Sequence, residues 1–560
     1  MTWHVTLDFD TYEAARSGFD WDVPADYNAA RDLLRKHENP DAPALYQAYP
    51  DGRRETYSFR ELDEQSNQVA NALVARGIGR GDRVAVVVPQ KPANPLTHLA
   101  CWKLGAVSLP LSVLFGPDAL GYRLRDSDTR AVVADESVLD TVAEIRGDCP
   151  DLEHVIAVDA PEAELAATDE TGGNVEAFEP MRTGHDSSFD IVHTDVETPA
   201  IVMYTSGSTG PPKGVLHTHG LWIGHCPAFY MYFERDVFDS VYWTPADWAW
   251  IGALGDTVFP AWHYGQPVLG YPMGQFDPET AFELMAEFGV TDAFLPPTAI
   301  RMLMNVDDPT GRYELDLEAI CSGGEPLTPE ILDWAAAELE GVVVNELYGQ
   351  TEANLLVTNC RDWFPAQASS MGKPVPGHRV SIIDPETGEQ RGDGEVGMIA
   401  VAHDSDPVVF EEYLGQPAKT EAVTVRGPDG TDWHLTEDLG YRDADGYFWF
   451  KARDDDVIIT SGYRVGPGEV ESAILEHPDV EQAGVIGVPD ETRGDIIKAF
   501  VQPAAGVEGD ATLATDIQNL VKGQLAKYEY PREIEFVDEL PTTTTGKIQR
   551  RKLRDREQHD

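Results

Sequence analysis

The segment at residues 204–214, YTSGSTGPPKG, constrains this chain more than any other stretch. An apolar lead-in at residues 200–203 predicts a buried strand that runs directly into it. Its glycines let backbone N–H groups turn toward one point, while its hydroxyls and Lys213 add donors and a cation, so it suits a polyphosphate. It is not a Walker loop, because Pro212 precedes the lysine and Gly214 follows it. A mobile surface linker is the alternative for a Gly/Ser stretch.

Three further segments follow in a fixed order: YGQTE at residues 348–352, TEDLGYRDADGY at 436–447 with Arg453 just after it, and PTTTTGK at 541–547. With the first segment, they resemble the signature motifs of the acyl-adenylate-forming superfamily, which contains acyl-CoA synthetases, adenylation domains of peptide synthetases and firefly luciferase. The resemblance extends from about residue 57 to the C-terminus. It makes an enzyme the expected function class.

The resemblance implies an α/β fold in two domains. Residues 1–453 would form a large N-terminal domain with parallel sheets flanked by helices and a small barrel-like part. Residues 454–560 would form a small mobile α+β lid, with Asp455 at the position of the family's hinge. The length agrees, since 560 residues exceed what one hydrophobic core usually supports.

The charge of the chain limits its partners. There are 97 acidic and 42 basic residues, which gives a net charge of −55. Repulsion on this scale weakens folding in dilute buffer, whereas molar salt cuts the screening length to about 3 Å, so we expect a halophilic host. An acidic disordered tail is disfavoured because the acids are spread along the chain. DNA, RNA and anionic membranes are not expected as partners.

Targeting and cysteine patterns favour a cytoplasmic protein. No run approaches the ~18 apolar residues of a membrane span, and the N-terminus, MTWHVTLDFD, is acidic, so we expect no signal peptide. The five cysteines include no CxxC pair and are odd in number. This predicts reduced thiols rather than disulfides or a zinc site.

Local patterns in the first half predict helices alternating with buried strands. Ser58 and Glu61 form a capping box for a helix that ends near Gly77. Its apolar face is expected to contain Leu62, Val69, Leu73 and Val74. A strand at residues 84–88 and an apolar stretch at 96–111 then continue the alternation of a parallel sheet.

Patterns further along the chain are weaker. The polar residues from about 160 to 198 predict an exposed connection. Beyond residue 454, we expect a helix near 469–475, a strand near 483–488, and an amphipathic helix through residues 517–525.

The resemblance assigns a nucleotide site residue by residue. The expected ATP and AMP contacts are Thr205, Ser206, Gly207, Ser208, Thr209, Gly210, Lys213, Gly324, Glu325, Pro326, Glu346, Tyr348, Gln350, Thr351, Asp438, Arg453 and Lys547. Tyr348 would offer a flat face to the adenine and Asp438 a carboxylate to the ribose hydroxyls. Outside this ordered set, a lone Asp or Arg in an acidic protein is more often a solvated surface group.

Four residues are expected to be catalytic by the same resemblance. Thr351 would offer its hydroxyl to the α-phosphate, Lys213 its charge to the phosphates, and Glu352 a hard carboxylate to Mg²⁺. Lys547 would lie next to both the substrate carboxylate and the α-phosphate and lower their repulsion. A basic tail is the alternative for Lys547. A lysine acetyltransferase that modified Lys547 would remove its charge and act as an off-switch.

The acid-binding site is expected in a Gly-rich, aromatic region. Residues 243–262 suit either core packing or a pocket wall. By resemblance, the acyl pocket is lined by Trp250, Ile251, Gly252, Gly323 and Gly349. We expect these glycines to leave open volume that favours a short- or medium-chain fatty acid of about four to eight carbons, because each buried CH₂ contributes ~0.8 kcal/mol. Acetate, propionate and aryl acids are the alternatives.

The expected reaction is ATP-dependent ligation of a carboxylic acid to CoA. The segment at residues 461–471, SGYRVGPGEVE, resembles the CoA-binding segment of acyl-CoA synthetases, with Gly462 and Arg464 as contacts. An adenylation enzyme that loads a carrier protein is disfavoured by that segment. A non-catalytic nucleotide-binding regulator would be expected to lose Lys547 or Glu352. A homo-oligomer is left open.

Overall fold

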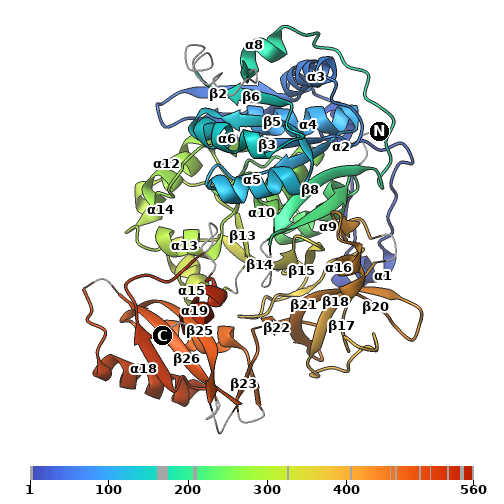
Figure 1. Cartoon of the computed structure of the whole chain (residues 1–560). Coiled ribbons are helices and arrows are strands. Elements are labelled where there is room, and N and C mark those ends of the chain that lie inside the picture. The colour runs from blue at the N-terminus through green and yellow to red at the C-terminus, as the bar shows by residue number, and fades with distance from the viewer. Residues whose placement is uncertain are drawn as a thin grey trace. The chain divides into compact units, whose positions relative to one another are not determined.

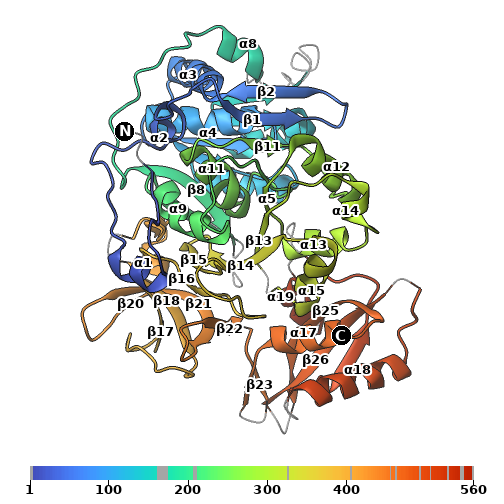
Figure 2. The same cartoon turned by 180° about the vertical axis from the view of Figure 1, so that it is seen from behind.

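The computed structural model describes residues 4–160, 175–205, 211–324, 327–403, 406–453, 456–460, 463–490, 494–504, 506–525, 529–542 and 548–557. Its Cα positions divide the chain into two compact units. The first contains residues 1–380, 401–424 and 430–434, and the second contains residues 381–400, 425–429 and 435–560. Figures 1 and 2 show the elements of each unit from opposite sides.

One sheet of the first unit is built mainly from parallel strands. Within the described residues it has eight strands in the order β19-β9-β8-β4-β3-β5-β6-β7. Their bounds are Glu412–Tyr413, Lys213–Thr218, Pro199–Thr205, Val107–Pro110, Arg83–Val87, Thr129–Asp135, His154–Val158 and Val175–Ala177. Strands β3 to β8 run parallel to one another, β9 is antiparallel to β8, and β19 is antiparallel to β9. The predicted parallel sheet is therefore confirmed.

Helices cover this sheet because their apolar residues need a buried face. Leu120 and Leu124 of α5 (Pro117–Asp126) pack with α6 (Leu139–Ile145) on the strands. In Figure 1, both helices lie in front of β3. Helix α4 (Ala93–Leu104) is buried on all sides, and contacts α3 (Phe59–Ala75) as well as β3 and β4. A helix that is largely apolar all round belongs in the interior.

A second sheet of the first unit carries the YGQTE motif. In the described chain it has nine strands in the order β16-β15-β14-β13-β12-β10-β11-β1-β2. Their bounds are Lys373–Pro374, Asn354–Thr358, Val343–Gln350, Ala319–Gly323, Asp292–Phe294, Tyr242–Trp243, Val268–Gly270, Pro43–Ala48 and Arg54–Ser58. Its core includes Trp243, Phe282, Met285, Ile320 and Val344.

The remaining helices of the first unit connect or cover these strands. They are α1 (Tyr12–Gly18), α2 (Ala29–Arg35), α8 (Phe178–Thr183), α9 (Leu221–Tyr232), α10 (Ile251–Ala253), α11 (Phe259–His263), α12 (Pro278–Phe288), α13 (Pro297–Leu303), α14 (Pro309–Arg312), α15 (Pro329–Glu338) and α16 (Pro417–Ala422). A π-helical turn over Leu254–Val258 joins α10 to α11. Among the helices that the structure describes, none has the length and apolar character needed to cross a bilayer.

The sequence predictions for α3 are confirmed with one correction. Ser58 accepts a hydrogen bond from the N–H of Glu61, whose carboxylate accepts one from the N–H of Ser58. Leu73 is buried as expected, but Val74 is 49% exposed. The prediction for Val74 is wrong because successive side chains on a helix point about 100° apart, so Val74 points away from the buried face that contains Leu73.

The expectation of an exposed connection over residues 160–198 is also partly wrong. Residues 161–174 lie outside the described part. The chain after them forms β7 and α8, in which Phe178 and Met181 are buried. The burial of these two apolar side chains is favourable, and it holds an otherwise polar segment against the rest of the first unit.

The second unit contains two smaller sheets. Most of the first of these sheets lies in the second unit. Its strands are, in order, β17 (Val380–Ile383), β18 (Gly397–Ala402), β21 (Asp432–Arg442) and β20 (Thr424–Arg426), with β22 (Phe448–Arg453) beside β21. The other has the order β24-β23-β26-β25, with β27 beside β26. Its strands are Tyr463–Val465, Ile458–Thr460, Gly494–Pro503, Val480–Asp490 and Glu533–Phe536.

Among the residues described, the second unit also contains the helices α17 (Pro467–Leu475), α18 (Ala511–Gln524) and α19 (Arg550–Glu557). Ile517 and Val521 of α18 are buried in its core. The helix, strand and amphipathic helix predicted beyond residue 454 are therefore confirmed. The domain boundary between residues 453 and 454 stays a prediction.

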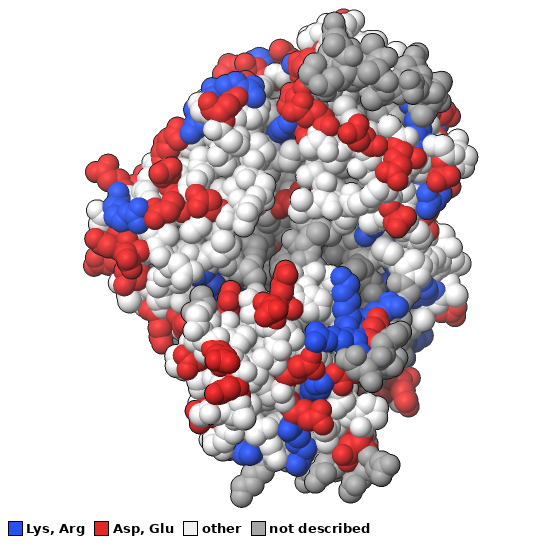
Figure 3. Space-filling model, turned by 60° about the vertical axis from the view of Figure 1, so that its left-hand side comes forward, with Lys and Arg blue, Asp and Glu red and all other residues white. Residues whose placement is uncertain are grey.

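The acidic residues do not form a block. On the face shown in Figure 3, Asp and Glu side chains are scattered among uncharged ones. The five cysteines, all in the described chain, are free, as predicted from their number and spacing, and all five are buried.

Candidate active site

The YGQTE motif forms the end of a strand and a tight turn. Strand β14 has an irregular register between Tyr348 and Gly349, and the chain returns as β15, with Gln350 opposite Asn354. Asn354 has a φ of 47°, in the left-handed region that Asn tolerates better than most residues. Thr351 and Glu352 therefore lie on a turn at the end of a buried sheet.

Two hydrogen bonds to backbone carbonyls of the turn hold it in place. Nε2 of His217, on β9, donates a hydrogen bond to the carbonyl of Thr351 at 2.6 Å. The N–H of Phe410 donates to the carbonyl of Glu352 at 2.9 Å. The turn is thus held from both sides by segments distant in sequence.

The Glu352 carboxylate and the Lys213 ammonium contact the same side chain. The hydroxyl of Tyr413 donates to Oε1 of Glu352 at 2.9 Å, and this contact is buried. Nζ of Lys213 lies 4.3 Å from the centroid of the Tyr413 ring. A cation and a carboxylate are therefore brought together at one end of β9, as a site for metal-bound phosphates requires.

The structure describes only the two ends of the predicted phosphate loop, and its phosphate-binding role stays a prediction. Thr205 ends β8 and stands opposite Lys213, the first residue of β9. Oγ1 of Thr205 is buried and has no hydrogen-bond partner among the described residues. Residues Ser206, Gly207, Ser208, Thr209 and Gly210 lie outside the described part, so their phosphate contacts stay predictions.

Two buried histidines beside the turn are neutral. Burial lowers the pKa of His217 to about 4, and its hydrogen bond to Thr351 only partly opposes this. Burial also lowers the pKa of His434 to about 3, helped by the positive charge of Lys213. Nε2 of His434 lies 3.4 Å from Oε1 of Gln350. Near neutral pH, these rings act as hydrogen-bonding groups rather than as cations.

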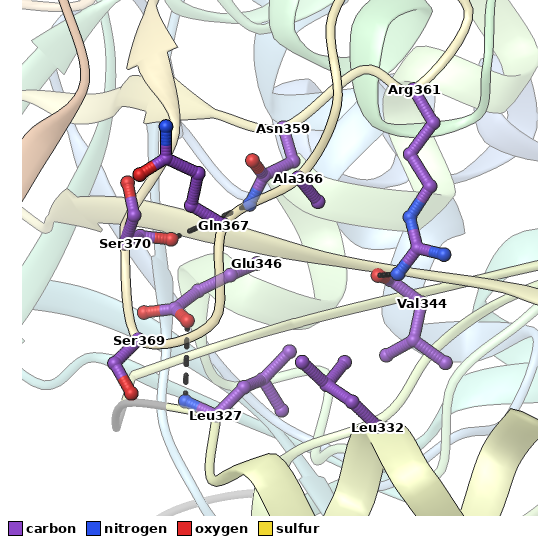
Figure 4. A pocket seen from close by; sticks show the side chains of 10 residues that line it. All are labelled: Leu327, Leu332, Val344, Glu346, Asn359, Arg361, Ala366, Gln367, Ser369 and Ser370. Atoms are coloured by element: carbon purple, nitrogen blue, oxygen red, sulfur yellow. Dashed lines mark hydrogen bonds between the residues drawn. The ribbon is translucent and has the colours of Figure 1, made fainter.

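Glu346 lines a small pocket on the same strand. The pocket is lined by Leu327, Leu332, Val344, Glu346, Asn359, Arg361, Ala366, Gln367, Ser369 and Ser370 (Figure 4). Oε2 of Glu346 accepts a hydrogen bond from the N–H of Leu327 at 3.3 Å. Burial raises the pKa of this carboxyl to about 8. Side chains alternate along a strand, so Glu346 and Tyr348 share one face of β14.

The expected adenine turn follows β13. Gly324 has a φ of 92°, which favours glycine. Glu325 and Pro326 lie outside the described residues, so their contacts stay predictions.

The aromatic segment is mainly core, with one exception. Trp243, Trp248 and Trp262 are fully buried, as the core-packing alternative predicts. Trp250 is half-buried, and its ring packs edge-on against Phe115 with centroids 6.0 Å apart. Ile251 and Gly252 are half-buried beside it.

The space that a side chain would enter is blocked at two of the three glycines and tight at the third. A Cβ on Gly349 would lie 1.6 Å from the carbonyl oxygen of Asn354, and one on Gly323 would lie 2.3 Å from Cδ1 of Leu347. A Cβ on Gly252 would lie 3.3 Å from the Phe294 ring. The reasoning from Gly349 is therefore wrong, because the turn's own backbone fills the space.

Two predicted ribose contacts pair in the second unit. Asp438 of β21 stands opposite Arg453 of β22, and Nε of Arg453 lies 3.9 Å from Oδ1 of Asp438. Nη2 of Arg453 also lies 3.4 Å from Oε2 of Glu437. Asp455, Gly462 and Lys547 lie outside the described residues, as does the side chain of Arg464.

No ready-made metal cluster is present in the chain as described. No group of three or more His, Cys, Asp or Glu side chains is arranged to hold a metal ion there. Glu352 nevertheless fits Mg²⁺, which is commonly held by one or two carboxylates plus substrate phosphates.

Several residues of this arrangement escaped sequence reasoning. They are Tyr413, His217, Phe410 and His434. Tyr413 lies 61 residues beyond Glu352 in a segment without chemical character of its own. Only the pairing of β19 with β9 brings it to the site.

Comparisons with known proteins agree with this geometry. The chain matches the AMP-binding enzyme family over residues 34–414 and the AMP-binding enzyme C-terminal domain over residues 469–547. It is 36% identical to human mitochondrial acyl-coenzyme A synthetase ACSM4, covering 96% of this chain and 91% of that protein. It is 35% identical to the acetyl-coenzyme A synthetase of Bacillus subtilis (strain 168), covering 97% and 94%.

Solved structures show the same fold. The anthranilate CoA ligase AuaEII in complex with anthranoyl-AMP aligns with a TM-score of 0.84 at 27% identity, over 96% of this chain and 98% of that one. The acyl-CoA synthetase of Brucella canis aligns with a TM-score of 0.73 at 32% identity, over 98% and 99%. The chain therefore belongs to the AMP-binding enzyme family, among its acyl-CoA synthetases.

Proposed function

We propose that this protein activates a carboxylic acid with ATP and transfers the acyl group to CoA. The carboxylate attacks the α-phosphorus of ATP, which gives acyl-AMP and pyrophosphate. The CoA thiol then attacks the acyl carbon, and AMP leaves. The observation that carries the proposal is the meeting of Lys213, Tyr413 and Glu352 beside Thr205. A cation, a carboxylate and a hydroxyl that has no hydrogen-bond partner among the described residues together suit a nucleoside triphosphate.

We assign each residue a part in the first step. Thr205 and Lys213 bind the phosphates, and the Thr351 hydroxyl faces the α-phosphate. Glu352 would hold Mg²⁺, which supplies charge neutralisation to the phosphates. Lys547 lowers the repulsion between the carboxylate and the α-phosphate as charge moves toward the leaving pyrophosphate. Tyr348, Glu346, Gln350, Gly324, Glu325 and Pro326 surround the adenine, and Asp438 and Arg453 contact the ribose.

The second step is assigned to the lid. We infer that residues 454–560 reorient about Asp455 between the two steps, and that Gly462 and Arg464 contact CoA. The net charge of −55 supports a halophilic host, and we infer that the enzyme is cytoplasmic. Acetylation of Lys547 would switch the first step off, and a homo-oligomer is compatible with this function.

The acid itself is proposed on narrower grounds. We infer a short- or medium-chain acid bound next to Trp250 and Ile251, with acetate, propionate and aryl acids as alternatives. The similar proteins include an acyl-CoA synthetase, an acetyl-CoA synthetase and an anthranilate CoA ligase, which supports this set of candidate acids. Gly349 and Gly323 no longer support the choice.

The test is pyrophosphate release across a panel of carboxylates, with and without CoA, in molar KCl. We expect sustained release that requires both an acid and CoA, with acyl-CoA and AMP as products. Release that is unaffected by CoA but proceeds with a carrier protein would overturn the CoA assignment. No release with any acid would overturn the proposed function.

A further inference from the structure

Tyr413 is the one described side chain that contacts both charged groups of the phosphate site. Its hydroxyl donates to Oε1 of Glu352 at 2.9 Å, and its ring faces Nζ of Lys213 at 4.3 Å from the centroid. The side chain is 1% exposed. One side chain therefore contacts a cation through its ring and an anion through its hydroxyl.

This arrangement has an electrostatic consequence. Lys213 and Glu352 have opposite charges, and without a spacer they would be attracted into an ion pair. Such a pair would neutralise the cation needed by the phosphates and the carboxylate needed by their metal. Neither residue forms an ion pair with any described side chain, whereas other bases, such as Arg54 and Lys103, are paired with acids.

The fold fixes Tyr413 in this position. Tyr413 pairs with Val215 in the β19 and β9 ladder, two residues from Lys213. Its backbone N–H donates to Oγ1 of Thr420 at 3.0 Å. The nearby Phe410 donates its N–H to the Glu352 carbonyl. Because these contacts hold the backbone on both sides of the site, the ring has little freedom to leave it.

We propose that Tyr413 is a positioning residue of the phosphate site, which orients the Glu352 carboxylate through its hydroxyl and keeps Lys213 unpaired through its ring. This inference rests on the proposed function of Lys213 and Glu352. It assigns separate tasks to the two parts of one side chain. The hydroxyl serves metal binding, and the ring serves the binding of ATP phosphates.

Two substitutions separate these tasks. Tyr413→Phe keeps the ring and removes the hydroxyl, whereas Tyr413→Leu removes both. The matched control is Tyr264→Phe, because the Tyr264 hydroxyl is also buried and donates to the carbonyl of Val5 at 2.6 Å. All proteins are studied as the full chain in molar KCl.

The measurements do not depend on turnover. Binding of Mn²⁺ is followed by electron paramagnetic resonance in the presence of ATP, without acid or CoA. Binding of metal-free ATP is followed by calorimetry. We expect Tyr413→Phe to weaken Mn²⁺ binding about 10-fold with little change in metal-free ATP binding. Tyr413→Leu should weaken both.

A double variant tests the spacer directly. If Tyr413→Leu lets Lys213 pair with Glu352, adding Glu352→Gln should restore much of the metal-free ATP binding. Failure of this rescue would overturn the spacer. Equal effects of Tyr413→Phe and Tyr264→Phe on Mn²⁺ binding would show a structural role only. Absence of pyrophosphate release by the wild type with any acid would instead reject the proposed function, whatever the Mn²⁺ result.

Discussion

Replacing Gly349 with alanine should damage the active site more than its small size suggests. The added Cβ would lie 1.6 Å from the Asn354 carbonyl oxygen, so this oxygen must retreat by about 1.4 Å to reach even 3.0 Å. The residues that move with it include Thr351 and Glu352. A misplacement of about 1 Å at a catalytic group costs on the order of 100-fold in rate, and overpacking costs about 1–3 kcal/mol of stability.

The assay is pyrophosphate release with saturating acid, ATP and CoA, together with thermal unfolding in molar KCl. The control is Gly523→Ala in α18, where a Cβ would meet nothing within 4 Å. Alanine in a helix should stabilise that site by about 0.5–1 kcal/mol. If Gly349→Ala retains wild-type rate and stability, the side-chain direction at residue 349 is open, and our account of the turn is wrong.

Three further predictions follow from charge. Raising KCl from dilute to molar should raise the unfolding midpoint, because salt screens the net charge of −55; a flat or falling midpoint would reject the halophile hypothesis. Lys547→Ala should reduce acyl-AMP formation by about 100-fold and spare thioester formation from premade acyl-AMP, as measured by rapid mixing; equal losses would indicate a structural role. Burial raises the pKa of Glu346 from 4.5 to about 8, so the native carboxyl keeps a proton that the unfolded chain releases in this window. The free energy of unfolding should therefore fall as pH rises between these values, and Glu346→Gln should flatten this dependence; an unchanged slope in denaturant titrations would contradict it.

Local patterns predicted the elements of the site well. The strand before the phosphate loop is β8, and the capping box at Ser58 begins α3. Both depend on residues within a few positions of one another, so the sequence contains the whole signal. The ordered motifs named Thr351 and Glu352 as candidates, and the structure places both on one turn.

Contacts between distant segments could not be predicted. Tyr413 reaches Glu352 only because β19 pairs with β9, and no residue near Tyr413 signals this pairing. The misjudged volume at Gly349 has a similar cause. A glycine in the sequence shows that a side chain is absent, but only the turn at Asn354 shows that backbone occupies the space.

The five buried cysteines can be used to detect when the structure around them opens. Burial raises the pKa of the thiols of Cys101, Cys226 and Cys360, and only a thiolate reacts readily with alkylating reagents. Modification must therefore wait for the surrounding structure to open. All five residues belong to the first unit, so the rate of alkylation would report local opening of that unit alone, without any engineered label.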